Sequence, residues 1–330
     1  MDIALNFFGD HHAPLKSIAR QLGISHAVCT VPLTARQSPY IEAWHPLALR
    51  SQVLEMESYG MRIAVLEGIK FIDAAKLGTG DCDQSIDNFC ALLKNMSQAG
   101  IHTVCYNWMP VFGWVRSRLE VPARGGARAT AFCSDDMQDV GMTSCGRVEG
   151  GMLWQTLEYF LSRVVPVAQQ YCIKLALHPD DPPVGSLAGV DRILISSDAM
   201  MKAVDLVPSE FNGVAFCQGT FATMGCDVPK EIRRFDQRIH FAHFRDVSGT
   251  AGNFVETFAD DGITDMAEAI EAYHDIGFQG VIRPDHTPTM IGEDNQVPGY
   301  GILGNLYAIG YLRGLMEAVE KRNTRRMACV

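Results

Sequence analysis

The chain has 330 residues, of which 47% are hydrophobic and 20% are charged, an ordinary balance for a globular protein. This composition excludes collagen-like, coiled-coil and largely disordered chains. A formal net charge of −10 argues against a nucleic-acid partner, and the sequence has no apolar run long enough to suggest a membrane partner.

Short apolar runs alternate with longer amphipathic stretches along the chain. Strands are predicted, in chain order, at residues 3–8, 26–31, 62–66, 102–106, 173–177, 213–216, 239–244 and 280–282. Helices are predicted at residues 14–22, 46–59, 84–98, 153–171, 197–206, 229–235, 265–276 and 303–321. Gly60 and Gly100 directly follow two of these helices, as expected of residues that end a helix.

A polar segment at residues 107–150 interrupts the alternation after the fourth strand. Connections of this length in compact domains are commonly active-site lids or disordered insertions, so we predict a lid-like insertion here. The strand–helix alternation itself predicts an α/β fold, a (β/α)₈ TIM barrel, as a single domain over residues 1–330. An open, doubly wound sheet alternates similarly, but no Gly-x-Gly-x-x-Gly follows the first strand.

The amino-terminal residues lack the basic and apolar regions of a signal peptide. The ten cysteines include no Cys-x-x-Cys pair, and in a chain of this length they are expected to be reduced thiols. We therefore expect a cytoplasmic protein.

Four polar residues fall at the carboxyl ends of four consecutive predicted strands: His178, Cys217, His243 and Asp285. In a barrel these ends meet on one face, where active sites are built. Two imidazoles, a thiolate and a carboxylate suit Mn, Fe, Co or Zn better than Mg or Ca. A strand-end histidine is often only hydrogen-bonded, and a lone cysteine is often a small buried side chain. Four such residues on successive strands nevertheless favour a metal site.

The residues beneath these candidates are small. Ala176 and Ala215 lie two positions before His178 and Cys217, so period-2 alternation places them on the same side of their strands. Inward-pointing alanines would leave room below a metal site.

Two further residues are candidates for proton transfer. His286 adjoins Asp285, and a histidine beside a metal can serve as a general acid or base. Tyr300 lies in a glycine-rich turn after the eighth strand, where its hydroxyl could act on protons near the metal. A turn tyrosine is more commonly a packing residue.

Other residues are candidates for substrate binding. Arg245 is expected to pair with a substrate carboxylate, although a salt bridge within the protein is the simpler role. Asn107 and Trp108 end the fourth strand and are expected to supply an amide donor and an apolar wall. Arg283 shares a strand face with Asp285 and is assigned to substrate binding as well.

The sequence lacks the motifs of several other enzyme classes. The sequence has no P-loop and no Gly-x-Ser-x-Gly elbow. The paired acids Asp180 and Asp181 stand in a proline-rich string, so a turn is a better interpretation than a glycosidase pair.

Six strings resemble the mannonate dehydratase family and occur in the family's order. They are Tyr-Asn-Trp-Met-Pro-Val-Phe at 106–112, Leu-His-Pro-Asp-Asp-Pro-Pro at 177–183, Cys-Gln-Gly-Thr at 217–220, His-Phe-Ala-His-Phe-Arg at 240–245, Arg-Pro-Asp-His at 283–286 and Pro-Gly-Tyr-Gly at 298–301. The resemblance implies a xylose-isomerase-like TIM barrel that uses Mn²⁺, or a related divalent metal such as Fe²⁺.

The resemblance also implies roles and a reaction. The family's metal ligands match His178, Cys217, His243 and Asp285. Its acid/base residues match His286 and Tyr300, and which of the two is the base stays open. The implied reaction is that of a hydro-lyase, which converts D-mannonate to 2-keto-3-deoxy-D-gluconate and water. The expected partner is therefore a small sugar acid, and a homo-oligomer such as a dimer is left open.

Three positions depart from the family's pattern: Gly113 where Asp is frequent, Gln218 where Thr is more familiar, and Thr287 where Gly is common. We expect positions 113 and 287 to line the sugar pocket, which leaves the exact sugar acid open. Two alternatives also stay open: a sugar isomerase or epimerase on the same metal-dependent barrel, and a sugar-acid-binding homologue without turnover.

Overall fold

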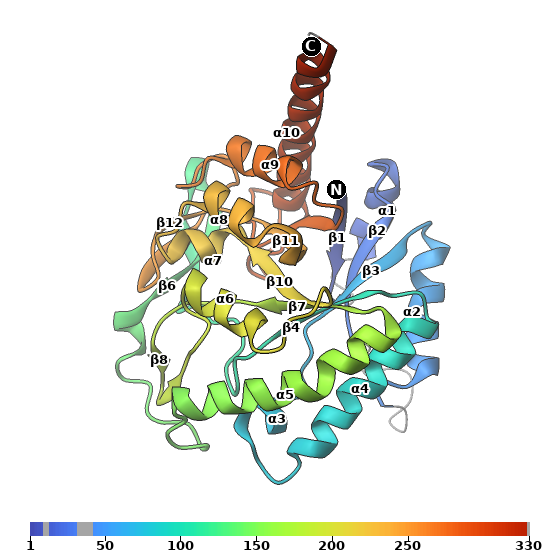
Figure 1. Ribbon diagram of the computed structural model, residues 1–330. Helices are drawn as coiled ribbons and strands as arrows, with labels where there is room; N and C mark the ends of the chain where they lie inside the picture. Colours follow the sequence, from blue (N-terminus) through green and yellow to red (C-terminus); the bar gives the residue numbers. More distant parts are fainter. Residues whose placement is uncertain (9–12, 32–41, 329–330) are drawn as a thin grey trace.

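The computed structural model describes residues 1–8, 13–31 and 42–328. Eight parallel strands close into a barrel in the order β1-β14-β11-β10-β7-β4-β3-β2 (Figure 1). Their bounds are β1 (Asp2–Phe7), β2 (His26–Thr30), β3 (Arg62–Glu67), β4 (Thr103–Asn107), β7 (Lys174–His178), β10 (Asn212–Cys217), β11 (Ile239–Phe244) and β14 (Val281–Pro284). The predicted TIM barrel is confirmed.

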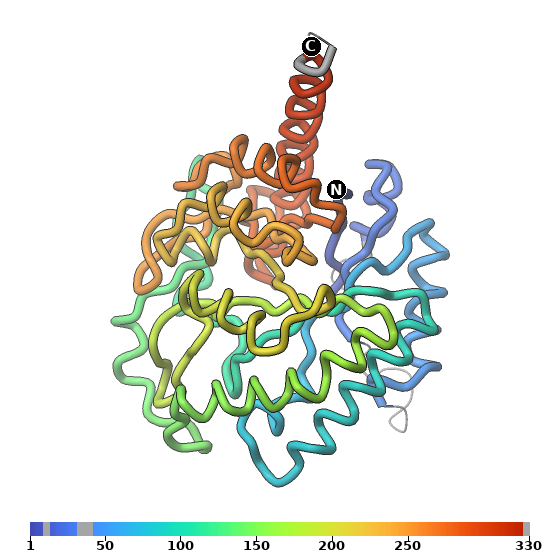
Figure 2. The backbone as a smooth tube through the Cα atoms, in the orientation of Figure 1, coloured from blue at the N-terminus to red at the C-terminus, as the bar shows by residue number. Residues whose placement is uncertain are grey.

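Helices surround the barrel and cover the outer faces of its strands. They are α1 (Ala13–Gln21), α2 (Pro46–Ser58), α3 (Asp73–Leu77), α4 (Cys82–Gln98), α5 (Gly150–Tyr171), α6 (Ser197–Asp205), α7 (Gln218–Thr223), α8 (Val228–Phe235), α9 (Met266–Asp275) and α10 (Ile302–Ala328). The short α3 and α7 were not predicted, and the end of α10 extends away from the barrel (Figure 2).

The barrel interior has its own small hydrophobic cluster, separate from the layer between strands and helices. It includes Ala176 and Ala215, as the alternation predicted, and Phe241 fills part of the space beside them. These three residues lie two positions before His178, Cys217 and His243 respectively. The interior is therefore packed below the candidate metal ligands.

The segment at 107–150 has more regular structure than a loop. It contains β5 (Arg118–Pro122) and β6 (Arg128–Cys133), with short 3₁₀ turns after each strand. β6 pairs with β13 (Asn253–Glu256), which pairs in turn with β12 (Val247–Thr250), so these strands form one antiparallel sheet. The sequence pattern did not reveal β5 because nearly all of its residues are exposed and show no apolar alternation. A two-stranded sheet, β8 (Ser186–Leu187) with β9 (Val190–Asp191), was also missed.

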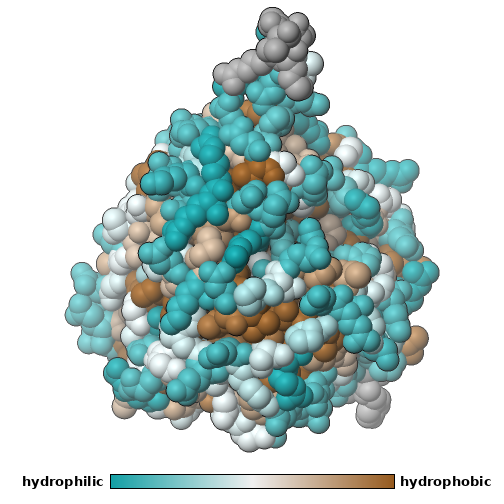
Figure 3. Space-filling model, viewed as in Figure 1, coloured by the Kyte–Doolittle hydropathy of each residue, from teal (hydrophilic) through white to brown (hydrophobic). Residues whose placement is uncertain are grey.

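The outer surface is mainly hydrophilic. On the face shown in Figure 3, hydrophobic colour is confined to a few separated areas. Among residues 1–8, 13–31 and 42–328, no helix combines the length and the apolar character that crossing a membrane requires. The apolar side chains lie mainly between the strands and the helices.

A buried histidine occupies an irregularity in the barrel wall. The register between β10 and β11 shifts at His240, and the His240 Nδ1 atom lies 2.7 Å from the carbonyl oxygen of Leu175. The ring passes close to Gly213, where a Cβ atom would lie 2.6 Å from the His240 Cε1 atom and 2.3 Å from the carbonyl oxygen of Arg238. Burial lowers the pKa of His240 to about 4, although the hydrogen bond to Leu175 opposes this shift.

This histidine predicts a pH dependence of stability. An unfolded histidine has a pKa of about 6.5, so at pH 5 the unfolded chain binds a proton at position 240 that the folded protein excludes. We expect the free energy of unfolding to be lower at pH 5 than at pH 7, by about 2 kcal/mol from this group. Urea unfolding of the wild type and His240→Gln at both pH values isolates this contribution. Equal pH dependence in the two proteins would contradict it.

Candidate active site

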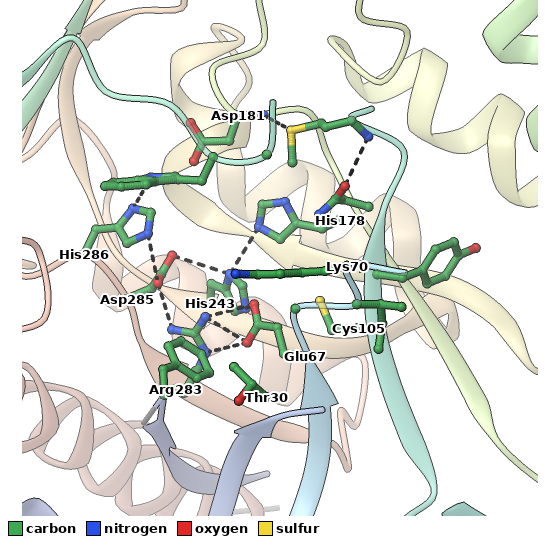
Figure 4. Close-up of a pocket in the computed structure, with 18 of the residues that line it drawn as sticks. Thr30, Glu67, Lys70, Cys105, His178, Asp181, His243, Arg283, Asp285 and His286 are labelled. Carbon is green, nitrogen blue, oxygen red and sulfur yellow. Dashed lines mark hydrogen bonds and ion pairs between the residues drawn. The ribbon is translucent and has the colours of Figure 1, made fainter. Parts of the chain in front are cut away.

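A cavity of about 600 Å³ opens at the carboxyl end of the barrel (Figure 4). Its lining comes from the ends of several strands and from the segment at 107–150. It includes Glu67, Lys70, Asn107, Gly113, Trp114, His178, Asp181, His243, Arg283, Asp285, His286 and Tyr300. Of the four residues predicted from strand ends, His178, His243 and Asp285 therefore line one cavity, as the barrel topology requires.

Two histidines direct a ring nitrogen toward each other in this cavity. The Nδ1 atom of His178 lies 2.7 Å from the carbonyl oxygen of Pro179 and donates its proton there, which leaves a lone pair on Nε2. The Nε2 atom of His243 lies 3.3 Å from Glu67 Oε1, and the tautomer with its proton toward that carboxylate would leave the lone pair on Nδ1. His178 Nε2 and His243 Nδ1 are 3.3 Å apart. Two facing lone pairs repel each other unless a cation or a proton lies beside them.

The other two predicted ligands lie at the same place. The donor atoms of His178, Cys217 and His243 are all within 4.8 Å of one another. Asp285 Oδ2 lies 3.5 Å from His243 Nδ1, the atom that faces His178. Thr220 donates a hydrogen bond to Cys217 Sγ at 3.2 Å. This mixture of nitrogen, sulfur and oxygen donors fits a divalent transition metal.

A second group of donors shares His243. Glu67 and Cys105 also have donor atoms within 4.8 Å of that ring and of each other. Arg283 contacts both oxygens of Glu67, whereas it contacts only Oδ1 of Asp285 and leaves Oδ2 facing His243. The group of His178, Cys217 and His243 is therefore the better metal position of the two.

Arg283 holds two carboxylates of the site in place. Its Nη2 atom lies 3.0 Å from both oxygens of Glu67, and its Nη1 atom lies 2.8 Å from Asp285 Oδ1. Burial alone would raise the pKa of Glu67, but Arg283 and His243 lower it to about 2. Arg283 lines the cavity as expected, but its guanidinium is engaged within the protein. Its direct role is to orient Asp285 and, through Glu67, His243.

The two proton-transfer candidates both contact Asp285. Its Oδ1 atom accepts a hydrogen bond from the Tyr300 hydroxyl at 3.2 Å and lies 3.4 Å from His286 Nε2. Burial lowers the pKa of His286, and burial together with Asp285 raises the pKa of Tyr300 well above its usual range. His286 also has a φ angle of 44°, in the left-handed region. Such backbone conformations persist where the surroundings fix a functional side chain.

The 107–150 segment reaches the site through Trp114. The Trp114 indole nitrogen donates to His286 Nδ1 at 3.0 Å, and the two rings lie 4.7 Å apart. Trp114 also lines the cavity and remains partly exposed. Sequence reasoning missed it, because a tryptophan in a long polar segment gave no sign of contact with a strand end.

Behind His286 lies a buried network of charges. Arg116 pairs with Asp181 through two hydrogen bonds, of 2.7 and 3.0 Å, and also with Glu256. Arg245 lies 2.9 Å from Asp181 and 2.8 Å from Glu256. The structure thus corrects the expectation for Arg245, whose guanidinium is committed to these carboxylates and lies outside the cavity lining. Asp181 is an ion-pair residue, whereas Asp180 accepts backbone hydrogen bonds from residues 193 and 194 as a turn residue does.

Asn107 and Trp108 have different positions. The Asn107 Oδ1 atom accepts hydrogen bonds from Lys76 at 3.2 Å and from the backbone of Met109 at 3.1 Å, so its NH₂ group is the end that can serve a ligand. Trp108 points to the helix layer, where its indole donates to the Leu153 carbonyl at 3.0 Å. The expectation that Trp108 forms a pocket wall is therefore wrong.

The three positions that depart from the family pattern differ in whether they line the cavity. Gly113 lines the cavity, as expected. Thr287 is buried and outside the cavity lining, and it forms an isolated bridge with Tyr300. Gln218 is fully buried in α7 behind Cys217. Of the three, Gly113 is the one placed to contact a substrate.

Glu67 could have been found from the sequence, because it ends β3 just as His178 ends β7. Arg116 and Glu256 could not, since both lie outside the barrel strands. Only the antiparallel sheet places them beside Asp181.

Comparison with known proteins gives consistent matches over nearly the whole chain. A family model described as D-mannonate dehydratase (UxuA) matches residues 1–150 and 141–326. A mannonate dehydratase of Oceanobacillus iheyensis is 30% identical, over 98% of this chain and 99% of the relative. The crystal structure of mannonate dehydratase from Streptococcus suis serotype 2 has a TM-score of 0.90 at 30% identity, covering 98% of this chain and 96% of that one. A D-psicose 3-epimerase of Clostridium cellulolyticum H10 has a TM-score of 0.64 at 12% identity, over 96% and 99% of the two chains, which is a likeness of fold alone.

The buried network predicts a large loss of stability when one of its cations is removed. Arg116→Met would remove one of the positive charges that neutralise the buried carboxylates of Asp181 and Glu256. This change should lower the free energy of unfolding by about 3–5 kcal/mol. Arg118→Met is the control, because Arg118 pairs with Asp136 at the exposed surface and should leave the free energy of unfolding nearly unchanged. Urea unfolding at pH 7 measures both. Similar losses in the two variants would contradict the role given to Arg116.

Proposed function

Because this chain belongs to the D-mannonate dehydratase family of hydro-lyases, we propose that it converts D-mannonate to 2-keto-3-deoxy-D-gluconate and water with the help of a divalent metal. The main structural support is one cluster: three metal-donor side chains meet beside Asp285, which also contacts His286 and Tyr300. Of the proposed metal ligands, His178, His243 and Asp285 line the same cavity as the proposed proton-transfer residues His286 and Tyr300.

The chemistry defines what the site must supply. Dehydration removes the proton on C2, next to the carboxylate, and expels the hydroxyl group on C3. The enol that forms then takes up a proton at C3 and becomes the 2-keto acid, so one molecule of water leaves for each substrate. The C2 proton is only weakly acidic while the carboxylate keeps its charge. A bound divalent cation would neutralise that charge and stabilise the enolate-like transition state.

The residues fit such a metal. His178 Nε2, His243 Nδ1, Cys217 Sγ and Asp285 Oδ2 would hold it, and Mn²⁺ or Fe²⁺ suits this set. Pro179 and Glu67 orient the two imidazoles, and Arg283 orients Asp285. Partners of this kind fix the ring orientation and the position of the imidazole proton.

His286 and Tyr300 would carry the protons. One of them accepts the proton from C2, and the other donates a proton to the departing hydroxyl. Their rings lie 5.2 Å apart and both touch Asp285 Oδ1, so the two groups can act on adjacent carbons. Trp114 and Arg116 would keep His286 in place and form the wall by which the 107–150 segment excludes water from this side.

The proposal predicts metal-dependent formation of a 2-keto-3-deoxy acid. The purified protein is stripped with EDTA, restored with Mn²⁺ and supplied with D-mannonate, and the product is identified by mass and by a 2-keto acid assay. We expect turnover with Mn²⁺ and none in the stripped control. A product of unchanged mass would instead indicate an isomerase or epimerase. Binding of metal and sugar acid without any product would indicate a homologue without turnover.

Substitutions should distinguish the proposed metal ligands from the proposed proton-transfer residues. Cys217→Ala should lose both metal and activity, because a ligand is removed. His286→Asn and Tyr300→Phe should retain the metal but lose turnover by about 10²–10⁴-fold, the usual contribution of acid–base groups. Metal content by mass spectrometry and initial rates with D-mannonate test this division. Full activity of both His286→Asn and Tyr300→Phe would overturn their assignment.

A further inference from the structure

We propose that Lys70 binds the carboxylate of the sugar acid and thereby distinguishes sugar acids from neutral sugars. This inference rests on the proposed function and adds to it the residue that recognises the charged end of the substrate. It concerns a residue outside the candidate metal ligands and the proton-transfer pair.

Besides the proposed metal, a carboxylate entering this cavity needs a cationic partner from the protein. The cavity is also lined by the carboxylates of Glu67, Asp73, Asp181 and Asp285, which repel an anion. A charged group that loses water without gaining a partner is bound weakly. Charge-assisted hydrogen bonds from a lysine or an arginine are the usual solution.

The other cations at the cavity are already engaged. Arg283 is shared between Glu67 and Asp285. Lys76 is buried and lies 3.0 Å from Asp73 Oδ1, and its amine also donates to Asn107 and to the Met109 carbonyl. Binding a substrate carboxylate at either residue would disrupt an existing ion pair. Arg116 and Arg245 lie behind the lining and are paired with Asp181 and Glu256.

Lys70 differs from all of these cations. Within the described part of the chain, its amine has no hydrogen bond and no salt bridge. The residue is exposed, lines the cavity, and points its side chain into it (Figure 4). Its ammonium group can therefore bind an anion without losing another partner.

The local backbone explains why Lys70 is placed there. β3 ends at Glu67, and Gly68 turns the chain with a φ angle of 75°. Ile69 is buried in the main hydrophobic core and anchors the turn. Lys70 follows directly, so an anchored turn holds this exposed residue in the cavity lining. This placement suits recognition of one end of a short, linear sugar acid.

The test compares an anionic ligand with its neutral counterpart. Lys70→Met, Lys70→Arg and the wild type are loaded with Mn²⁺, and KM for D-mannonate and the inhibition constant of D-mannitol are measured. D-Mannitol carries a CH₂OH group in place of the carboxylate. Lys94→Met is the control, because Lys94 is an exposed lysine on α4 and does not line the cavity.

Lys70→Met should raise KM for D-mannonate about ten- to a hundredfold, as expected for loss of a hydrogen bond between charged groups. It should leave the inhibition constant of D-mannitol and the metal content within about twofold of wild type. Lys70→Arg should restore part of the affinity, and Lys94→Met should match the wild type. An unchanged KM in Lys70→Met, or equal weakening of D-mannonate and D-mannitol, would overturn the proposal.

Failure of the proposed function gives a different result. If the Mn²⁺-loaded wild type does not convert D-mannonate, its binding and that of D-mannitol are measured directly by calorimetry in the same four proteins. Selective loss of D-mannonate binding in Lys70→Met would support Lys70 even though the reaction is wrong. Equal binding of D-mannonate by the wild type and Lys70→Met, or no binding by either, would reject Lys70 as well.

Discussion

Charges buried at the carboxyl end of the barrel need partners, and this requirement organises the whole site. Removing an ion from water is costly unless an opposite charge and good hydrogen bonds replace the water. Arg283 serves Glu67 and Asp285, while Arg116 and Arg245 serve Asp181 and Glu256. The barrel strands and the 107–150 segment are joined by the second of these groups. The candidate metal ligands and His286 are held where the two groups meet.

This arrangement divides the cations into two kinds. The guanidiniums are buried and shared between carboxylates, so they fix positions within the protein. Arginine suits this work, because its planar fork binds two carboxylates at once. Lys70, at the rim of the cavity, has an exposed amine that is available to a ligand. The positive charges most evident in the sequence, Arg245 and Arg283, thus both contact carboxylates of the protein, and the proposed substrate contact is a less conspicuous lysine.

Much of the fold and part of the site could be predicted from the sequence. Alternating strands and helices indicated the barrel, and strand-end positions brought His178, Cys217, His243 and Asp285 together because parallel strands share one carboxyl end. The same reasoning failed for Trp108, which follows the inward-facing Asn107 and so points outward. It also missed Trp114 and Arg116, since the pairing of β6 with β13 joins segments far apart in the chain.

The sequence by itself determined which residue types stand at the strand ends, and therefore the donor atoms of the candidate metal site. This follows because side-chain alternation and strand direction are local properties of the chain. Only the tertiary structure decided which charges pair. Arg245 could have faced a substrate, but Asp181 and Glu256 occupy its guanidinium. Ion pairing depends on distances between residues remote in sequence, and folding of the antiparallel sheet onto the barrel sets those distances.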